Sequence, residues 1–476
     1  MTGHRMDPRI DPIDPDGSRD PSDPSGEQWD RSVAGERWDR SVAGERWDRS
    51  VAGQLSDRSV AGQLGIAVRV TPSFPDAARF VGAVEVGLRR NPNRAQLLVS
   101  RVLGKHIGVP VGEVRAAADA LGSVVRSACA GQTPVVVGFA ETATGLGHGV
   151  AAISAADGGP APCLHTTRRP APAGARVVRF SEEHSHATDQ ALVLLDDAGL
   201  RGNRPLVLVD DELTTGSTAV NAIAAIQSAW PRDSYVLASL IDCRDDDRRA
   251  EVVRSVRALG AEVTSVSLLD GRVTVPAGAV AAVREFFGAW PDSPAWSRPA
   301  ARAQVTWADV RLPDGVPSIG AHGWGPDQER AAGAAMYAAA ASLPVAGDGS
   351  TLVLGDEELM YLPQLLARAV GDQVRTSTTT RTPAVTIDRP GYPLRTALSF
   401  PSTQDGRRPV YAYNVAASGH AEPGNAPGFD HIVFVTDAAR GPRTSGLVGE
   451  LAAAARRSVH VITVVQANGG QRGVSR

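Results

Sequence analysis

Two adjacent acids followed by a short loop of hydroxyls are the residues of this chain best suited to chemistry. Asp210 and Asp211 come directly after the apolar run 206–209. The loop that follows contains Thr214, Thr215, Gly216, Ser217 and Thr218. The acids can accept hydrogen bonds from neighbouring sugar hydroxyls, and the N–H and O–H groups of the loop can surround a phosphate. The pattern therefore predicts a site for a sugar that carries a 5′-phosphate.

The elements around these residues would place them where ligands bind. The apolar run predicts a buried parallel strand, and residues 221–226 have helical spacing. Open α/β sheets bind ligands just outside the carboxyl ends of their strands, which is where both acids would lie. Gly216 would let the backbone approach a phosphate closely. The alternative is an ordinary strand–turn–helix in which Thr and Ser cap the helix, but the length and context of the motif favour the phosphosugar site.

This stretch resembles the phosphoribosyl-pyrophosphate (PRPP) loop of the type I phosphoribosyltransferases. The acid pair and the Thr-Thr-Gly-Ser-Thr run match the family pattern, whereas Glu212 stands where the family usually has an aliphatic residue. We expect the charge of Glu212 to face solvent, a metal or the substrate. The resemblance implies that Asp210 and Asp211 hold the ribose hydroxyls or a metal-bound ribose, and that residues 214–218 hold the 5′-phosphate. It also implies Mg²⁺ as the cofactor, bound together with PRPP.

Composition narrows the class of protein. At 476 residues the chain is long enough for two or three domains, and a net charge of -3 excludes a global attraction to nucleic acid or anionic membrane, so no direct DNA binding is expected. No apolar run approaches membrane-spanning length, and no signal-peptide core is present. The three scattered cysteines lack metal-ligand spacing and predict reduced thiols in a cytoplasmic protein. Lys105 is the single lysine, hence the one candidate if catalysis needs a side-chain amine.

The N-terminal residues 1–63 have the composition of a disordered tail rather than a domain. A nine-residue unit starts at Trp29, Trp38 and Trp47, with a degenerate copy from Ser56. Neither a helix nor a strand would gather these tryptophans on one face, because nine residues turn a helix by about half a circle and are odd in number. The near-identical copies indicate a recent duplication in a disordered segment, and a peptide-binding role is the alternative.

A segment upstream of the acid pair carries a second resemblance. Residues 91–106 are similar to a segment found in orotate-phosphoribosyltransferase-like proteins that are encoded with bacterial tellurite-resistance (ter) gene clusters. Lys105 and His106, at the end of this segment, could reach the substrate. The alternative is a solvated pair after a helix.

A glycine-rich stretch over 138–149 follows a predicted buried strand at 133–137. In type I phosphoribosyltransferases the loop after the first core strand binds pyrophosphate, and this stretch occupies the matching place. The resemblance implies that role for Glu141, Thr142, Thr144 and Gly145. A structural glycine-rich turn is the alternative. The stretch is not a dinucleotide fingerprint, since the last required glycine is a valine.

Residues 177–189 resemble, by their position, the flexible hood of the family, which closes over PRPP and excludes water. Just before them, Arg168 or Arg169 could clamp pyrophosphate oxygens. His184 and His186 could move a proton or ligate a metal. We therefore predict that Arg168 and both histidines act at the catalytic centre, and a surface histidine pair is the alternative.

Alternating strand and helix patterns over 135–269 predict a mostly parallel sheet wrapped by helices. The expected fold class is α/β. It comprises a type I phosphoribosyltransferase fold with hood over 64–290, a linker over 291–303 and a second α/β domain over 304–476.

The second domain contains its own candidate residues. Residues 376–383 resemble the signature of the TRSP domain, which follows the transferase domain in the ter-linked subgroup. The hydroxyls there would suit a phosphate or phosphosugar together with Arg381, Arg389 and Arg395, and a Thr-rich edge strand is the alternative. Three acids at predicted strand ends could form a second polar site: Asp356, Glu357 and Asp437.

The resemblance implies a reaction in which a base-like acceptor displaces pyrophosphate from C1 of PRPP. The product would be a nucleoside-like metabolite linked to stress or tellurite resistance. A homodimer is an open expectation, because the residues do not reveal the oligomeric state. The acceptor cannot be named from the residues. Two alternatives come from other classes: a non-catalytic regulator that senses PRPP, and a stress-response scaffold that recruits partners.

Overall fold

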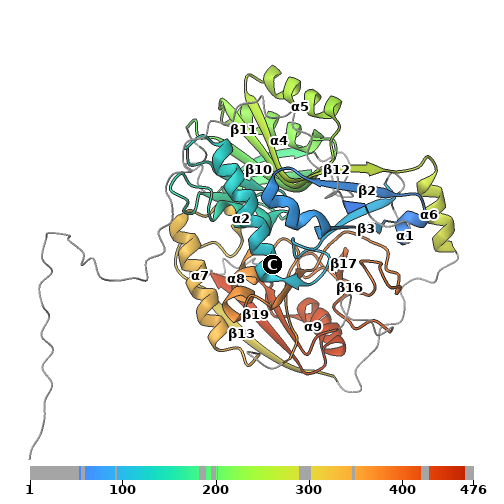
Figure 1. Cartoon of the computed structure of the whole chain (residues 1–476). Helices are drawn as coiled ribbons and strands as arrows, with labels where there is room; N and C mark the ends of the chain where they lie inside the picture. The colour runs from blue at the N-terminus through green and yellow to red at the C-terminus, as the bar shows by residue number, and fades with distance from the viewer. Residues whose placement is uncertain are drawn as a thin grey trace, which may run out of the picture. The chain divides into compact units, whose positions relative to one another are not determined.

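The computed structural model describes residues 53–54, 59–89, 91, 94–181, 189–194, 200, 202–288, 302–345, 349–419 and 428–466 (Figure 1). These residues belong to one compact unit, Ser50–Arg476. Most of the predicted tail and both candidate histidines of the hood lie outside the described residues.

The first sheet has the strand order β1-β2-β12-β11-β10-β6-β7. Its parallel strands are β6 (Val135–Gly138), β7 (Cys163–His165), β10 (Leu206–Leu213), β11 (Ser234–Asp242) and β12 (Glu262–Thr274). β2 (Ala67–Pro72) and β1 (Gly53–Gln54) extend the β12 edge in antiparallel pairing. The prediction of a mostly parallel sheet is confirmed.

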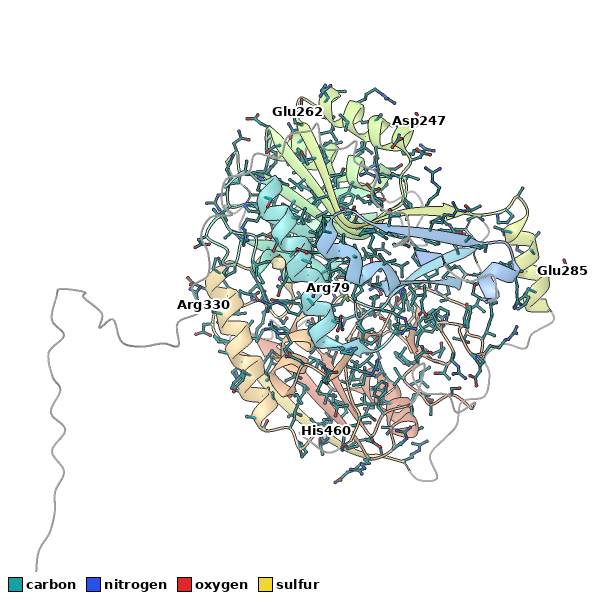
Figure 2. All side chains as sticks on the ribbon, in the orientation of Figure 1. Arg79, Asp247, Glu262, Glu285, Arg330 and His460 are labelled. Carbon is teal, nitrogen blue, oxygen red and sulfur yellow. The ribbon has the colours of Figure 1, made fainter. Side chains whose placement is uncertain are left out.

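Helices pack on both faces of this sheet, as the continuous apolar run of β10 requires. They are α2 (Val111–Ala128), α3 (Thr144–Ala151), α4 (Ser217–Ala229), α5 (Asp246–Ala258) and α6 (Ala279–Gly288). Val207 and Val209 enter the core cluster that contains α2, whereas Leu206 and Leu208 enter the cluster that contains α4. A strand buried on both faces needs apolar residues at successive positions, which explains why it does not alternate. Exposed charged residues such as Asp247 on α5 lie on the outside (Figure 2).

Several short elements lie outside the strands of the first sheet. They are the 3₁₀ helix η4 (Pro75–Ala83), the hairpin of β3 (Val84–Leu88) and β4 (Gln96–Ser100), and the hairpin of β8 (Arg176–Ser181) and β9 (Asp189–Leu194). The predicted tail boundary at residue 63 is too late. β1 pairs with β2, and α1 (Val60–Gln63) buries Val60 and Ala61 in the core.

The second sheet has the order β13-β19-β18-β14-β15-β5. Its parallel strands are β13 (Gln304–Leu312), β14 (Thr351–Gly355), β15 (Arg375–Thr378), β18 (His431–Thr436) and β19 (Ser458–Gln466). The helices are η6 (Gly320–His322), α7 (Pro326–Ala341), α8 (Tyr361–Val370) and α9 (Pro442–Ala454), and β16 (Ala397–Pro401) pairs with β17 (Pro409–Tyr413). A second α/β unit, with its own six-stranded sheet, therefore follows the first along the chain.

The last strand of the second sheet comes from the first half of the chain. β5 (Val109–Pro110) pairs with β15 in antiparallel orientation, with Thr376 opposite Val109. β15 is therefore covered on both sides, and the alternative that its threonines form an edge strand is wrong. The two halves of the chain share a sheet.

Three cysteines have no disulfide partner in the described structure: Cys129, Cys163 and Cys243. Among the helices of the described ranges, none combines the length and apolar character needed to cross a bilayer.

Helix α3 and strand β6 lie so close at two glycines that an added methyl group should be destabilising. A Cβ added at Gly147 would lie 2.7 Å from the Gly138 Cα atom. We expect Gly147→Ala to lower the free energy of unfolding by about 1–3 kcal/mol, because the helix must move away from the strand. Urea unfolding followed by circular dichroism would measure this change.

The matched control is Gly333→Ala in α7, where an added Cβ meets no atom within 4 Å. There the same substitution should stabilise by up to about 1 kcal/mol, since alanine favours helix. Equal effects of the two substitutions would contradict the close approach.

Candidate functional site

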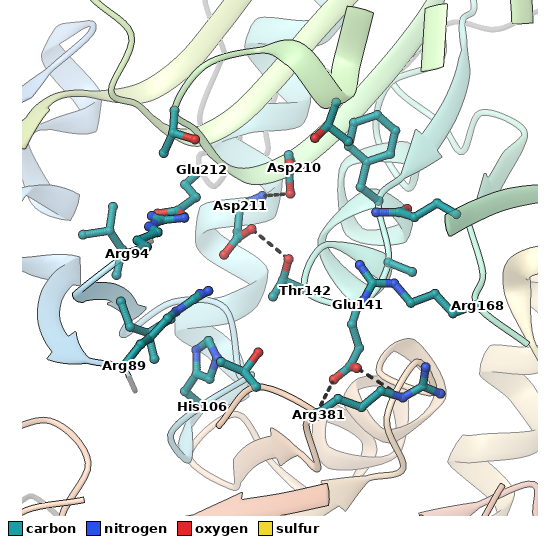
Figure 3. A pocket seen from close by; sticks show the side chains of 18 of the residues that line it. Arg89, Arg94, His106, Glu141, Thr142, Arg168, Asp210, Asp211, Glu212 and Arg381 are labelled. Carbon is teal, nitrogen blue, oxygen red and sulfur yellow. Dashed lines mark hydrogen bonds and ion pairs between the residues drawn. The ribbon is translucent and has the colours of Figure 1, made fainter. Parts of the chain in front are cut away.

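The first sheet has its topological switch point between β6 and β10. From β6 the chain continues to β7 on one side, and β10 then returns to pair with the other side of β6. At such a point the loops leaving adjacent strands diverge and open a crevice. A cavity of about 300 Å³ lies there, and residues following both strands line it (Figure 3).

The predicted acid pair lies at this cavity. Asp210 and Asp211 line the wall, and the Thr142 Oγ1 atom donates a hydrogen bond of 2.8 Å to the Asp211 Oδ1 atom. The backbone N–H of Asp211 donates to the Asp210 Oδ1 atom at 2.9 Å. Burial, reinforced by the charge of Glu212, raises the pKa of the Asp211 carboxyl above its ordinary value. A ligand that brings hydroxyl donors or a cation would stabilise these carboxylates.

The hydroxyl loop ends in the N-terminus of α4. Gly216 occupies the N-cap with a φ of 84°, a left-handed conformation that favours glycine, and its missing side chain leaves room beside Val252. Thr215 Oγ1 accepts a hydrogen bond of 3.2 Å from the Ser217 N–H. Because the N-cap has no side chain, N–H groups of the first helical turn are available to an anion.

Four of the five predicted phosphate-loop residues line the cavity: Thr214, Thr215, Gly216 and Thr218. Ser217 does not line it. The structure therefore brings the acid pair and most of the hydroxyl loop to one cavity, and their binding roles stay a prediction.

Glu212 is compensated within the protein. Its Oε1 atom accepts a hydrogen bond of 2.5 Å from the Arg94 guanidinium, which lies just before β4. The charge of Glu212 raises the pKa of Arg94. Glu212 also lines the cavity, so the expectation that it faces the substrate or a metal stays a prediction, although an arginine distant in sequence pairs with one of its oxygens.

Glu141 lies at the centre of a buried ion cluster. The Lys105 Nζ atom contacts the Glu141 Oε1 atom at 2.6 Å, and the Arg381 backbone N–H donates to the same oxygen at 3.2 Å. Burial by itself would raise the pKa of the Glu141 carboxyl, but Lys105, Arg381 and Arg168 outweigh it and lower the pKa to about 2. The carboxylate is thus held by protein cations rather than presented to a ligand.

Lys105 is fully buried, so a solvated position for it is wrong. It also donates to the carbonyl oxygens of Glu357 and Thr379, each at 3.3 Å. An amine with these partners holds the two halves of the chain together and does not reach a substrate.

His106 does reach the cavity. Its side chain lines the wall and is 3% exposed, and its Nε2 atom has no hydrogen-bond partner within the described residues. Burial, together with the charges of Lys105 and Arg89, lowers its pKa to about 3. The ring is therefore neutral at physiological pH and retains hydrogen-bonding capacity for a ligand.

The two adjacent arginines have different surroundings. Arg168 lines the cavity, and its backbone N–H donates to the Glu358 Oε1 atom at 2.9 Å. Arg169 instead pairs with Asp437 of the second sheet at 2.6 Å. Arg168 is therefore the one positioned to contact a ligand.

Two residues predicted to bind pyrophosphate lie elsewhere. The Thr144 side chain is buried and donates to the Glu358 carbonyl oxygen at 3.0 Å, and a Cβ at Gly145 would lie 2.6 Å from the Gln364 Nε2 atom. Both belong to the first turn of α3, which packs against the second half of the chain. The predicted roles of Thr144 and Gly145 are corrected to interdomain packing, whereas Glu141 and Thr142 do line the cavity.

The predicted second polar site consists of internal contacts. Asp356 accepts from Thr403 and Thr436, and Glu357 pairs with Arg381. Asp437 pairs with an arginine of the first half, as described above. The three carboxylates therefore bind protein groups, and a separate ligand site among them is not supported. Arg395 is likewise paired internally, with Asp388 at 2.6 Å.

Several cavity residues were not expected from the sequence. The first half adds Arg89, Arg94, Leu97, Leu98 and Gln190, and the second half adds Thr382, Pro383, Arg408, Pro409 and Tyr411. Of the second half, Arg381, Thr382 and Pro383 belong to the TRSP-like signature at 376–383, which is the signal that could have found them. Arg408, Pro409 and Tyr411 have no motif and reach the cavity only through docking of the two halves.

Two family models match the chain. Residues 83–272 match a family described as phosphoribosyl transferase, and residues 318–451 match the TRSP domain that lies C-terminal to that transferase. Residues 83–272 thus belong to a phosphoribosyltransferase family, the class expected from the PRPP-like loop. More specifically, the chain combines this transferase domain with the TRSP domain that follows it. No curated protein matches the sequence significantly.

Solved structures of phosphoribosyltransferases are similar to part of the chain. Adenine phosphoribosyltransferase from Trypanosoma brucei, in complex with AMP, pyrophosphate and ribose-5-phosphate, is 13% identical over 42% of this chain and 81% of that one, with a TM-score of 0.31. The Giardia lamblia enzyme complexed with 9-deazaadenine is 18% identical over 40% and 95%, with a TM-score of 0.30. Orotate phosphoribosyltransferase from Aeropyrum pernix is 18% identical over 44% and 93%, with a TM-score of 0.25. These scores are too low to carry an argument, so the class rests on the family matches and the sheet topology.

The lowered pKa values of two buried histidines predict how the free energy of unfolding depends on pH. Burial lowers the pKa of His106 to about 3 and that of His165 to about 4. Since the unfolded chain binds protons on these rings near pH 6.5 and the folded chain does not, stability should fall as pH falls below about 6.5. Each such histidine contributes about 1.4 kcal/mol per pH unit.

His106→Gln removes one of these contributions. We expect the slope of unfolding free energy against pH, measured by urea titrations between about pH 6 and 5, to decrease by about 1.4 kcal/mol per unit in the variant. An unchanged slope would mean that His106 is protonated in the folded protein.

Proposed function

We propose that this protein is a Mg²⁺-dependent phosphoribosyltransferase that transfers the ribose 5-phosphate of PRPP to a base-like acceptor and releases pyrophosphate. The observation that carries the proposal is that Asp210, Asp211 and the phosphate loop line one cavity at the switch point of a transferase-family sheet. A carboxylate pair beside an anion-binding helix N-terminus suits a sugar that carries both hydroxyls and a phosphate.

Different residues of the cavity would bind the three parts of PRPP: the 5′-phosphate, the ribose and the pyrophosphate. The N–H groups at the start of α4, with Thr214 and Thr218, would hold the 5′-phosphate. The carboxylates of Asp210 and Asp211 would accept hydrogen bonds from the ribose hydroxyls. Arg168, across the cavity from the acids in Figure 3, would bind the pyrophosphate by charge-assisted hydrogen bonds.

The donor chemistry of the site is compatible with Mg²⁺. Among the described residues no group of three or more His, Cys, Asp and Glu side chains is arranged to hold a metal ion. Asp210 and Asp211 supply carboxylate oxygens, the ligand type that Mg²⁺ prefers, and the ion usually takes further ligands from substrate phosphates and water. Bound there with PRPP, Mg²⁺ would neutralise charge on the pyrophosphate group.

The reaction breaks the bond between C1 of ribose and a pyrophosphate oxygen and forms a bond from C1 to the acceptor. The electron pair of the broken bond leaves with pyrophosphate, and the acceptor supplies the pair for the new bond. The carboxylates of Asp210 and Asp211 would stabilise positive charge that develops on the ribose, and Arg168 would stabilise the leaving group. No covalent intermediate with the protein is needed.

The acceptor would occupy the side of the cavity lined by Leu97, Leu98 and Tyr411, with His106 nearby. Apolar side chains and an aromatic ring suit a planar base, and a neutral imidazole suits its polar edge. Synthesis of a nucleoside-like metabolite in a stress or tellurite response, and assembly as a homodimer, stay predictions. A cytoplasmic location is part of the proposal and is supported by the three unbridged cysteines.

The test is calorimetry of PRPP with Mg²⁺, on the full chain and on the double variant Asp210→Asn/Asp211→Asn. We expect binding at micromolar concentrations in the unaltered protein and a loss of about tenfold or more in the variant, because neutral amides hold hydroxyls and a cation more weakly. Pyrophosphate release with a panel of heteroaromatic bases would then identify an acceptor.

Asp327→Asn is the matched control, because Asp327 forms an exposed ion pair with Arg330 away from the cavity. It should bind PRPP as the unaltered chain does. Absence of PRPP binding in the folded, unaltered protein would overturn the proposal. Binding without pyrophosphate release from any acceptor would favour the sensing regulator.

A further inference from the structure

We propose that the TRSP domain contributes to the transferase site, and that its Arg381 is a positioning residue for the cavity-lining loop that carries Glu141 and Thr142. The inference rests on the proposed function and assigns a task to the second half of the chain. Three observations support it: the place of Arg381 in the cavity wall, its ion pair with Glu357, and its contact with Glu141.

Arg381 reaches the transferase cavity from the second sheet. It follows β15 by three residues and lines the cavity together with Thr382, Pro383 and Tyr411 of the same half. β15 itself is paired with β5 of the transferase half. The segment that carries the TRSP-like signature is thus attached to the transferase by backbone hydrogen bonds immediately before it enters the cavity wall.

The guanidinium of Arg381 is held in one orientation. Its Nε and Nη2 atoms both lie 2.5 Å from the Glu357 Oε2 atom, and Ser402 donates to the other oxygen of Glu357 at 2.5 Å. The Arg381 side chain is only 12% exposed. Because Ser402 holds the Glu357 carboxylate and Glu357 holds the Arg381 guanidinium, Arg381 can position the residues that it contacts.

What Arg381 contacts is Glu141. Its backbone N–H donates to the Glu141 Oε1 atom, and its Nε atom lies 3.7 Å from the Glu141 Oε2 atom (Figure 3). The next residue, Thr142, donates to Asp211. Arg381 is therefore linked through one loop to the carboxylate pair of the proposed active site.

The charges of this cluster matter for a pyrophosphate ligand. Lys105 and Arg381 carry positive charge, and Glu141 and Glu357 carry negative charge, so the cluster is neutral overall. Without the Arg381 guanidinium these four side chains would be net negative, in the wall of the cavity where Arg168 is proposed to bind pyrophosphate. Both the position of the loop and the local potential thus depend on a residue of the TRSP domain.

The experiment separates this task from general stability. Calorimetry on the full chain would use two probes, Mg²⁺-pyrophosphate and ribose 5-phosphate. We expect Arg381→Gln to weaken pyrophosphate binding by about tenfold or more, the size expected for lost charge-assisted contacts, with ribose 5-phosphate binding changed by less than about twofold. Arg381→Lys keeps the charge and should lie between the unaltered protein and the Gln variant.

Arg375→Gln is the matched control. Arg375 also crosses between the two halves, donating to the Gly108 carbonyl oxygen at 2.7 Å, but it does not line the cavity. It should leave binding of both probes unchanged. Thermal unfolding would verify that each variant is folded.

The outcomes are distinguishable. Pyrophosphate binding unchanged in Arg381→Gln, or a parallel loss of both probes, would overturn the positioning role while leaving the proposed function intact. If Arg381→Gln fails to fold, equal binding of pyrophosphate by Arg381→Lys and the unaltered protein would overturn it as well. An unaltered protein that binds neither probe would overturn the proposed function and this inference together.

Discussion

The buried ion cluster of Lys105, Glu141, Arg381 and Glu357 is the constraint on which the rest of the structure depends. Charges removed from water are stable only if they are paired, and breaking a buried pair is far more costly than losing an exposed one. Lys105 and Glu141 come from the transferase half, and the other two come from the TRSP half. Each ion pair is thus formed within one half. The two pairs meet where the Arg381 N–H donates to Glu141 and where Lys105 donates to the carbonyl oxygens of Glu357 and Thr379. Separating the halves would leave these buried groups without those partners.

The carboxyl ends of both sheets face this shared interior. Residues after β6 and β7, such as Thr144 and Arg169, bond to residues after β14 and β18, such as Glu358 and Asp437. In a single open α/β domain this edge would be the ligand crevice and would be open to water. Here the second domain covers part of it, and the remaining cavity at β6 and β10 is lined by residues of both halves. Such partial cover fits the proposed transfer, which needs a site shielded from water.

The electrostatics of the cavity are arranged around what a ligand would bring. Asp210, Asp211, Glu212, Glu141 and Arg168 all line the cavity. Arg94 pairs with Glu212, and the ion cluster pairs with Glu141. The burial that makes His106 neutral also raises the pKa of Asp211, because a low-dielectric wall penalises the charged form of both groups. A ligand that supplies hydrogen bonds or opposite charge would stabilise both groups. The proposed ligand, PRPP with Mg²⁺, has both features.

The local sequence determined the parallel sheet, the acid pair and the phosphate loop, since each depends on a continuous run of residues at fixed spacing. The apolar run of β10 needs cover on both faces, and Gly216 at the N-cap needs no distant partner to take its conformation. Only the tertiary structure decided that Lys105 is a buried ion-pair partner that also donates to carbonyl oxygens of the second half, that Thr144 faces the second domain and that Tyr411 lines the cavity. The physical reason is that the environment of a side chain, and so its charge and its contacts, is set by segments far away in the chain, which local spacing does not encode.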